Sequence, residues 1–427
     1  MIPLTETFQI DMEFLAEQRP HRTRNEGLLL EYTPPADAYN LQKMQRFITE
    51  FVSNAVDYRT DPAELPVFGL EIHYSDDKIR YLLYLSDASL MRPLINRLDV
   101  DFGGGLSRLE PQTPNGGKWF VPIREDDHVA AAEMHLKHHF YEPLRSYKTS
   151  HSSADDFKSP YPNVFQQMVD ERDTREVIQI LFKPYGVNWT DATLRSLEGR
   201  ADAVEGRQTT SRSRLFDLDS GYFNVEDDVS VPDNVQKSIR DIKSQQGKVG
   251  YFTNVRFAAI SSDANVARSQ LQHITAEFKQ KYRDPGTGQT LLPIIQRGAD
   301  IEDLILNMID RRPKYMEWPS LSRAAARPAR GYCETTLITP EELVSLAHFV
   351  SKSHDYTNSL TWATTGRSEQ LPPDYASHYK EYYAEGKERR KPWKETTNDW
   401  SEEERQQQSE EVYIEGDVEE QFGTDES

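Results

Sequence analysis

The sequence predicts an α+β protein, with a ferredoxin-like N-terminal unit, a second α+β unit and a charged C-terminal tail. Two observations predict the first unit. Apolar residues alternate along 68–74 and again along 79–85, on either side of a polar turn, which is the pattern of a β-hairpin. Apolar residues at three- and four-residue steps, before and after that hairpin, predict helices over 41–52 and 90–98.

Two further strands complete the first unit. The apolar run Leu28–Thr33 ends at two prolines, and a last strand is expected over Lys118–Ile123. The resulting order, β-α-β-β-α-β, is that of the ferredoxin-like fold. A helix over about Asp127–Tyr141 is predicted next, because its apolar residues also recur at helical spacing.

The chain is predicted to divide into four regions. Residues 1–147 form the first domain, 148–170 a polar linker with little core, and 171–365 the second domain. A mobile insertion rich in Asp, Ser, Arg and Gly is expected at about 198–236. Residues 366–427 are predicted to be largely disordered, because their scattered apolar side chains cannot offset the chain entropy lost on folding.

The second domain also alternates strands with helices. Strands are predicted at Val177–Phe182, Tyr251–Ile260 and Leu291–Ile295. Apolar spacing predicts helices over 263–278 and 301–308. The two halves are therefore expected to be loosely related α+β units.

One helix start has every expected feature. Thr339 is the N-cap residue, a proline occupies the first helical position, and Glu342 at the third position completes a capping box. Ile338 and Leu343 are placed to form a hydrophobic staple. This helix is predicted to run to about Phe349.

Charge is distributed unevenly along the chain. The net charge is −20, but 395–427 holds thirteen acidic residues and one basic residue, so the rest of the chain carries −8. Acidic residues with little Lys (18, against 32 Arg) are typical of a halophilic protein, since high salt screens dense charge. Overall acidity disfavours non-specific coating of DNA, which needs a basic face.

Composition also bears on location. The first residues lack the basic start and apolar run of a signal peptide, and no window approaches the ~18 apolar residues of a membrane-spanning helix. A cytoplasmic location without membrane insertion is expected. The single Cys333 excludes an internal disulfide and a Cys-based zinc site, and a buried, inert thiol in a strand is expected.

The motif of a nucleotide-hydrolysing motor, GxxxxGK followed by Ser or Thr, does not occur in the sequence. None of the three Gly-Lys pairs is followed by Ser or Thr, since the next residues are Trp119, Val249 and Glu388. Spacing alone brings out no Ser/His/Asp or Cys/His arrangement, although folding rather than sequence sets such triads. We expect neither enzymatic activity nor a bound cofactor.

Three histidines lie close together in the sequence EMHLKHHF. In the predicted helix, His135 and His139 share a face at four-residue spacing, with His138 beside them. A zinc site needs a third ligand with an oriented second shell, so solvated histidines on an amphipathic helix are the favoured interpretation. The sequence leaves open whether they bind metal.

The sequence DLDSGYFNVEDD has some likeness to a calcium-binding loop. Asp217 and Asp219 stand at the first and third positions. The glycine comes one place early, however, and Asp228 replaces the glutamate at position twelve. A solvated acidic insertion is the favoured interpretation.

The segment KERRKPWK, residues 387–394, is the most basic part of the chain. Five of its eight residues are basic, and a tryptophan is available to stack on a base. The alternative is that it neutralises the adjoining acidic tail. The candidate contacts to nucleic acid or a partner are Lys387, Arg389, Arg390, Lys391, Trp393 and Lys394.

Three stretches together resemble a known family. They are FGLEIHYSDDKIRYLLYLSDASLMRPLINRL (68–98), EVIQILFKPYGVNW (176–189), and RFAAISSDANVARSQLQHITAEF (256–278) with the later LITPEELVSLAHF (337–349). The chain over roughly 28–365 resembles the region upstream of the motor in DNA-pumping ATPases of conjugation and type IV secretion, particularly the archaeal and Gram-positive ones. Here a proline-containing segment and the charged tail follow, in place of the family's nucleotide-binding domain.

The resemblance implies the non-motor part of such an ATPase, encoded alone and assembling with a separate motor ATPase. It carries over no catalytic residue. Two other functions stay open: a nucleic-acid-binding protein that uses the basic segment 387–394, and a structural protein of a plasmid or virus. Direct contact with DNA and homo-oligomerisation are also left open.

Overall fold

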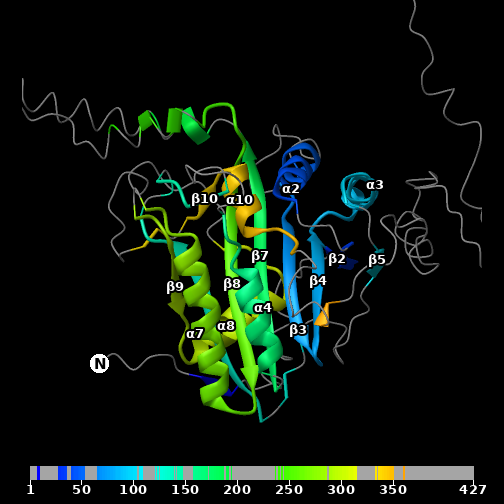
Figure 1. Cartoon of the computed structure of the whole chain (residues 1–427), viewed down its shortest axis with the longest axis vertical. Coiled ribbons are helices and arrows are strands. Elements are labelled where there is room, and N and C mark those ends of the chain that lie inside the picture. Colours follow the sequence, from blue (N-terminus) through cyan, green and yellow to red (C-terminus); the bar gives the residue numbers. More distant parts are fainter. Residues whose placement is uncertain are drawn as a thin grey trace, which may run out of the picture.

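The described strands of the computed structural model form one ten-stranded sheet, and helices lie on both of its faces (Figure 1). The neighbouring strands pair antiparallel throughout. Apart from short gaps within them, the structure describes residues 7–9, 27–52, 65–102, 105–108, 121–147, 157–194, 236–314, 332–350 and 359–360.

The first unit has the topology of a ferredoxin-like fold. Its elements are β2 (Leu28–Thr33), α2 (Leu41–Arg46), the π-helix η2 (Phe47–Val52), β3 (Phe68–Ser75), β4 (Lys78–Leu85), the short 3₁₀ turn η3 (Ala88–Leu90), α3 (Met91–Asp101) and β5 (Gly105–Arg108). In space the strands lie in the order β5–β2–β4–β3, which is fourth, first, third, second. The predicted ferredoxin-like N-terminal unit is confirmed.

The second unit repeats this topology. Its elements are β6 (His128–Leu136), α4 (Tyr161–Asp170), β7 (Thr174–Gly186), β8 (Gly250–Ser261), α7 (Ala264–Lys281) and β9 (Leu291–Ile295). The strands lie in the order β9–β6–β8–β7, again fourth, first, third, second. The chain therefore contains two units of the same βαββαβ arrangement.

The two units join through their second strands. β3 pairs with β7 antiparallel, from Phe68 opposite Phe182 to Tyr74 opposite Glu176. We call this strand pair the seam. It makes one continuous sheet of the two units, so the exposed edge that each second strand would present alone is covered by the other.

The helices of the two units lie on the same face of the sheet; they are α2 with η2, α3, α4 and α7. On β3 and β4, Phe68 and Tyr81 share that face, because Ile72 pairs with Tyr81 and successive side chains alternate. Phe51 of η2 contacts Phe68 at 5.8 Å between ring centroids, and Phe165 of α4 meets Tyr81 at 6.3 Å. Helices of both units thus meet over the seam, and their apolar faces share one core.

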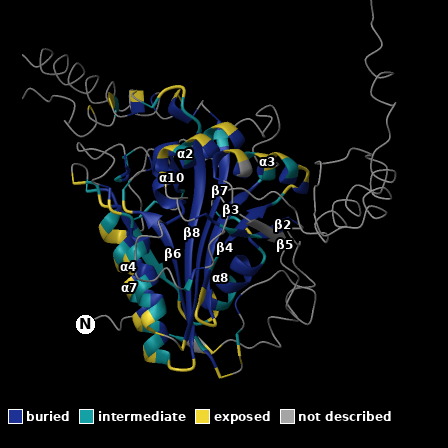
Figure 2. Ribbon diagram, turned by 45° about the vertical axis from the view of Figure 1, so that its right-hand side comes forward, coloured by how far each residue is buried: buried dark blue, intermediate teal, exposed yellow. Residues whose placement is uncertain are grey.

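Four further elements complete the described fold. The strand β1 (Phe8–Gln9) extends the edge of β6, and β10 (Leu337–Ile338) pairs with one end of β8. The helix α10 (Pro340–Leu346) follows β10, and α8 (Ala299–Ile309) follows β9. In Figure 2 the central strands are buried almost throughout, while exposed residues gather on the outer sides of α4 and α7.

The predicted hairpin is confirmed, with a two-residue turn. β3 and β4 pair from Phe68 opposite Leu85 to Ser75 opposite Lys78. Asp76 and Asp77 have φ values of 52° and 58°. Left-handed φ at both central residues defines the turn whose twist matches that of a hairpin, and Asp tolerates it better than most residues.

The helix predicted over 127–141 is wrong, because this segment forms strand β6. The run VAAAEM lies between β8 and β9 and is buried on both faces, so apolar residues occupy consecutive positions. A subset of such a run also satisfies helical spacing, and its alanines favour helix. The second unit therefore begins inside the predicted first domain, 1–147.

The polar linker predicted over 148–170 is wrong from residue 161 onward. Residues 161–170 form α4, whose Tyr161, Val164, Phe165 and Met168 are fully buried against the sheet. The prolines at 160 and 162 suggest a break, but proline is tolerated in the first turn of a helix, where its missing N–H would have no partner.

The remaining predictions have mixed outcomes. The strands and helices predicted for 177–308 are confirmed as β7, β8, α7, β9 and α8. The fourth strand of the first unit is β5, and Val121 and Ile123, from the strand predicted at 118–123, lie outside any strand. The tail 366–427 and nearly all of the insertion predicted at 198–236 lie outside the described residues.

Candidate functional site

A row of polar side chains crosses the centre of the sheet. Glu71 of β3 pairs with Gln179 of β7, Gln179 with Arg256 of β8, and Arg256 with Glu133 of β6. We call these four residues the polar row. Each lies in an otherwise apolar stretch of strand, on the face opposite the main helices, and each is buried. The row therefore spans both ferredoxin-like units and crosses the seam.

Hydrogen bonds connect the members of the polar row. Gln179 Nε2 donates to Glu71 Oε1 at 2.8 Å, across the seam. Arg256 Nη1 donates to Gln179 Oε1 at 3.4 Å, and Arg256 Nε donates to Glu133 Oε1 at 3.0 Å. Gln179 thus links an acidic group of the first unit to a basic group of the second.

Arg311, just after α8, completes the network. Its Nε and Nη2 donate to the two carboxylate oxygens of Glu71, each at 3.0 Å. Arg311 has a φ of 49°, a left-handed conformation that is uncommon outside glycine. The bidentate ion pair and complete burial hold this turn in place.

The polar row also binds the main chain around the end of α8. Gln179 Nε2 donates to the carbonyl of Met308 at 2.8 Å, and Arg256 Nη1 donates to the carbonyl of Arg312 at 2.8 Å. Asn254, two residues before Arg256 on β8, both accepts from and donates to the backbone of Lys314. Side chains from the second unit therefore fix the segment 308–314 against the sheet.

Both carboxylates of the network are held ionised. Burial alone would raise the pKa of Glu71, but Arg311 and the hydrogen bond to His73 lower it to about 2. Burial would likewise raise the pKa of Glu133, but His135 and Arg256 lower it to about 2. Two buried arginines thus balance two buried carboxylates.

The network is suited to structural rather than chemical work. Each carboxylate is already bound to a guanidinium group, and the side chains are buried. A general base needs an accessible atom and a pKa near the working pH, which a carboxyl with a pKa of about 2 does not have. The polar row instead specifies strand register, since a slip by one residue would bury unpaired charges.

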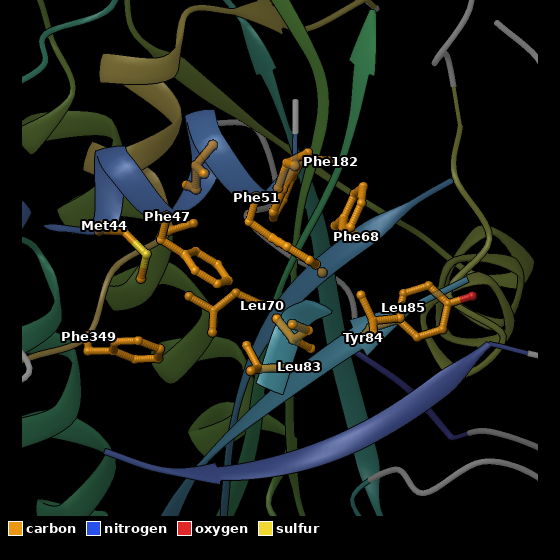
Figure 3. Close-up of a pocket in the computed structure, with 15 residues that line it drawn as sticks. Met44, Phe47, Phe51, Phe68, Leu70, Leu83, Tyr84, Leu85, Phe182 and Phe349 are labelled. Carbon is orange, nitrogen blue, oxygen red and sulfur yellow. The ribbon is translucent and has the colours of Figure 1, made fainter. Parts of the chain in front are cut away.

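An apolar cavity lies on the other face of the sheet, beneath η2. Its volume is about 30 Å³, and Figure 3 shows aromatic and aliphatic side chains converging on it, among them Phe47, Phe51, Phe68 and Phe182. Phe68 and Phe182 stack at 5.8 Å directly across the seam. Apart from the hydroxyl of Tyr84, the side chains that line it are apolar, so it offers little to hold water or a polar ligand.

The structure places one of the three predicted histidines inside the protein. His135 is buried on β6, with its ring 4.9 Å from that of Tyr332 and its Nε2 3.6 Å from Glu133 Oε2. His138 follows the strand and is half-buried, and His139 lies outside the described residues. Because the segment is a strand, the helical spacing behind the metal hypothesis does not apply.

Other candidate residues are placed as follows. In the part of the chain that the structure describes, no three His, Cys, Asp or Glu side chains are grouped to hold a metal ion. Cys333 is half-buried rather than buried, and its Sγ donates to the carbonyl of Thr335 at 3.2 Å. The acidic residues 217, 219 and 228 and the whole basic segment 387–394 lie outside the described residues.

Sequence reasoning missed the polar row, although each strand carries a signal for it. A single charged or amide residue interrupts each of the apolar stretches FGLEI, VIQILF, VRFAAI and VAAAEM. In a strand buried on both faces, such a residue must have a partner. The sequence does not state which residues pair, because the four strands lie far apart along the chain.

By its fold, the chain is an α+β protein in which two ferredoxin-like units share one sheet, and the polar row crosses the seam between them. The chain also belongs to a family: a domain of unknown function, DUF8128, matches residues 3–361. A comparison with curated proteins finds no match. Among the described helices, none has the length and apolar character needed to cross a membrane.

Proposed function

We propose that this chain is a non-catalytic docking or assembly subunit of a DNA-transfer apparatus and acts with a motor ATPase encoded separately. The resemblance of 28–365 to the region upstream of the motor in conjugation ATPases supports this role. The observation that carries it is the seam between the two units. Linked domains usually move relative to one another, whereas two units that share a sheet and a buried charge network offer one rigid surface.

We place this subunit in the cytoplasm, and we expect that several copies of it can assemble with one another. The acidic composition with little Lys supports a cytoplasm of high ionic strength as the place where the chain works. Homo-oligomerisation would suit a docking subunit, and analytical ultracentrifugation of the purified chain would show it.

Affinity purification from the native host tests the proposal. The tagged chain, cross-linked in the cell and purified, should carry with it a second polypeptide that contains a GxxxxGK[ST] loop. The control is the same host expressing the affinity tag without the chain. Recovery of the chain without any nucleotide-binding polypeptide would argue against the proposal, and recovery with virion or plasmid structural proteins would favour a structural role.

One specific observation favours nucleic-acid binding as a second candidate function. Five basic residues and Trp393 within eight positions could neutralise phosphates and stack on a base. A variant with these five basic residues changed to Gln should lose DNA binding, and truncation after Lys394 should raise affinity at low salt by removing the acidic tail. Binding that is indifferent to both changes would exclude this candidate.

A further inference from the structure

The end of α7 lies beside the start of α4, on the outer side of the second unit. The two helices lie side by side (Figure 1), and Asn163 Nδ2 of α4 donates to Glu277 of α7 at 3.2 Å. One turn further along α4, Gln167 Nε2 lies 2.7 Å from His273 Nδ1. The helices are therefore antiparallel, and the residues just before α4 lie next to Lys281 in the last turn of α7.

Tyr282, the buried C-cap residue of α7, fixes a third segment at the same place. Its carbonyl accepts from the backbone N–H of Arg145, in the loop after β6, at 3.2 Å. Its ring lies 6.1 Å from that of Phe157, just before α4, and its hydroxyl donates to the carbonyl of Ser345 at 2.5 Å. The loop after β6, the entry to α4 and the end of α7 thus meet around one buried side chain.

Five cationic residues lie on these three segments, and we call them the basic corner. They are Arg145, Lys158, Lys279, Lys281 and Arg283. Lys158, Lys279 and Arg283 are exposed, and the other two are half-buried. The stretches 142–147, 157–158 and 279–285 contain two acidic residues, at 142 and 284, so five positive charges less two negative ones leave +3. The chain as a whole carries −20.

The cations of the basic corner lack the carboxylate partners that many other surface cations have. Arg97 pairs with Glu50 at 2.6 Å, and Lys314 pairs with Asp303 at 2.6 Å. Over the described ranges, no side chain of the basic corner forms an ion pair. The dipole of α7 favours two lysines in its last turn, but it does not explain the three cations outside the helix.

The aromatic residues of this region are not available to stack on bases. Tyr147, Phe157 and Tyr282 are all buried. Proteins that hold single strands use exposed aromatic side chains as well as cations, whereas duplex DNA can be held through its phosphates alone. The described part of the corner therefore offers charge without a stacking surface, which suits the closely spaced phosphates of a duplex.

We infer that the basic corner binds the phosphate backbone of double-stranded DNA without reading its sequence. The inference goes beyond the docking role proposed above, which does not require the chain to touch DNA, and it concerns residues other than 387–394. Because the rest of the chain is acidic and repels phosphates, the corner also determines which side of the protein faces the duplex.

Fluorescence anisotropy with a short labelled duplex of mixed sequence tests the inference in the full chain. The titration is made at the lowest salt concentration at which circular dichroism shows the folded protein. Lys279→Gln/Lys281→Gln/Arg283→Gln should weaken binding about tenfold or more. It should also reduce the slope of log affinity against log salt by about 2 to 3, since each lost phosphate contact removes about 0.9.

The matched control removes the same charge from the first unit. Arg46→Gln/Lys78→Gln/Arg92→Gln changes three cations that likewise form no ion pair within the described residues. This variant should bind the duplex as the wild type does. A chain whose five basic residues in 387–394 are changed to Gln should still respond to the change at 279, 281 and 283, which separates the two basic regions.

Four outcomes would overturn the inference. They are a folded wild-type chain that does not bind the duplex, a corner variant with wild-type affinity and salt slope, equal losses in the corner and control variants, and tighter binding of a single strand of the same length. Displacement of the duplex by an equal charge concentration of polyglutamate would instead assign the corner to an acidic protein partner. None of these results bears on the docking role, which the search for a co-purifying ATPase tests separately.

Discussion

Glu71 and Arg311 form a bidentate ion pair in the interior, although 240 residues separate them in the sequence. The pair connects the second strand of the first unit to the turn that follows α8 of the second. Gln179 bonds to the same carboxylate from across the seam. One glutamate thus joins β3, β7 and the end of α8.

Removing one partner of this pair should destabilise the fold strongly. Arg311→Met leaves the Glu71 carboxylate buried without its main counter-charge, and the expected loss in free energy of unfolding is about 3–5 kcal/mol. Chemical denaturation measures this loss. The double variant Glu71→Gln/Arg311→Met should lose less than the sum of the two single variants, because it leaves no buried charge unpaired.

The partly exposed pair Lys314–Asp303 provides a control a few residues away. Its side chains are 32% and 46% exposed, and its atoms are 2.6 Å apart. Water and salt screen such pairs, so Lys314→Met should cost only about 0–1 kcal/mol. Equal losses in Arg311→Met and Lys314→Met would show that the buried pair does not organise the seam.

Stability should fall in acid because of the polar row. Glu71 and Glu133 have folded pKa values of about 2, below their unfolded value of 4.5. Each therefore stabilises the fold above pH 4.5, and this contribution is lost as the pH falls through 4.5 towards 2. Thermal melting from pH 6 to 2.5 should show this decline, and Glu133→Gln, already less stable at pH 6, should show a shallower one. An identical decline in that variant would assign acid sensitivity to other groups.

The start of α10 should be sensitive to its N-cap. Thr339 and Glu342 form the predicted capping box, and both Ile338 and Leu343 are buried. Thr339→Ala should cost about 1 kcal/mol, and Leu343→Ala about 2–5 kcal/mol, since the latter leaves a cavity in the core. Val100→Ala is a suitable control, because that side chain is 78% exposed. A Leu343→Ala protein that unfolds at the wild-type denaturant concentration would contradict this packing.

Local patterns predicted much of the fold. Alternation located the β3–β4 hairpin, and helical spacing located α3, α7 and α8, because in these elements one face is clearly more apolar. The start of α10 followed from side-chain chemistry within four residues. Its predicted end at Phe349 was too late, since the helix ends at Leu346 and the backbone of Ala347, with φ −109° and ψ 89°, is no longer helical.

Features that depend on distant pairing could not be predicted in the same way. β6 satisfies helical spacing, and only its position between β8 and β9 explains why both of its faces are apolar. The polar row likewise depends on the register of four strands and on Arg311 after α8. The second β-α-β-β-α-β unit could not be recognised from the sequence, because its first strand, β6, begins at His128 and has apolar spacing that also fits a helix.

ATP turnover by the chain, prepared in two ways, tests the central claim most directly. Purified from a heterologous host, the chain should bind no nucleotide and hydrolyse no ATP, since its sequence lacks the GxxxxGK[ST] loop. Purified under gentle conditions from its native host, the same chain should be accompanied by ATPase activity. On a further chromatography column, this activity should elute with a second polypeptide. Saturable hydrolysis by the heterologous chain, or native preparations without any hydrolysis, would contradict the account.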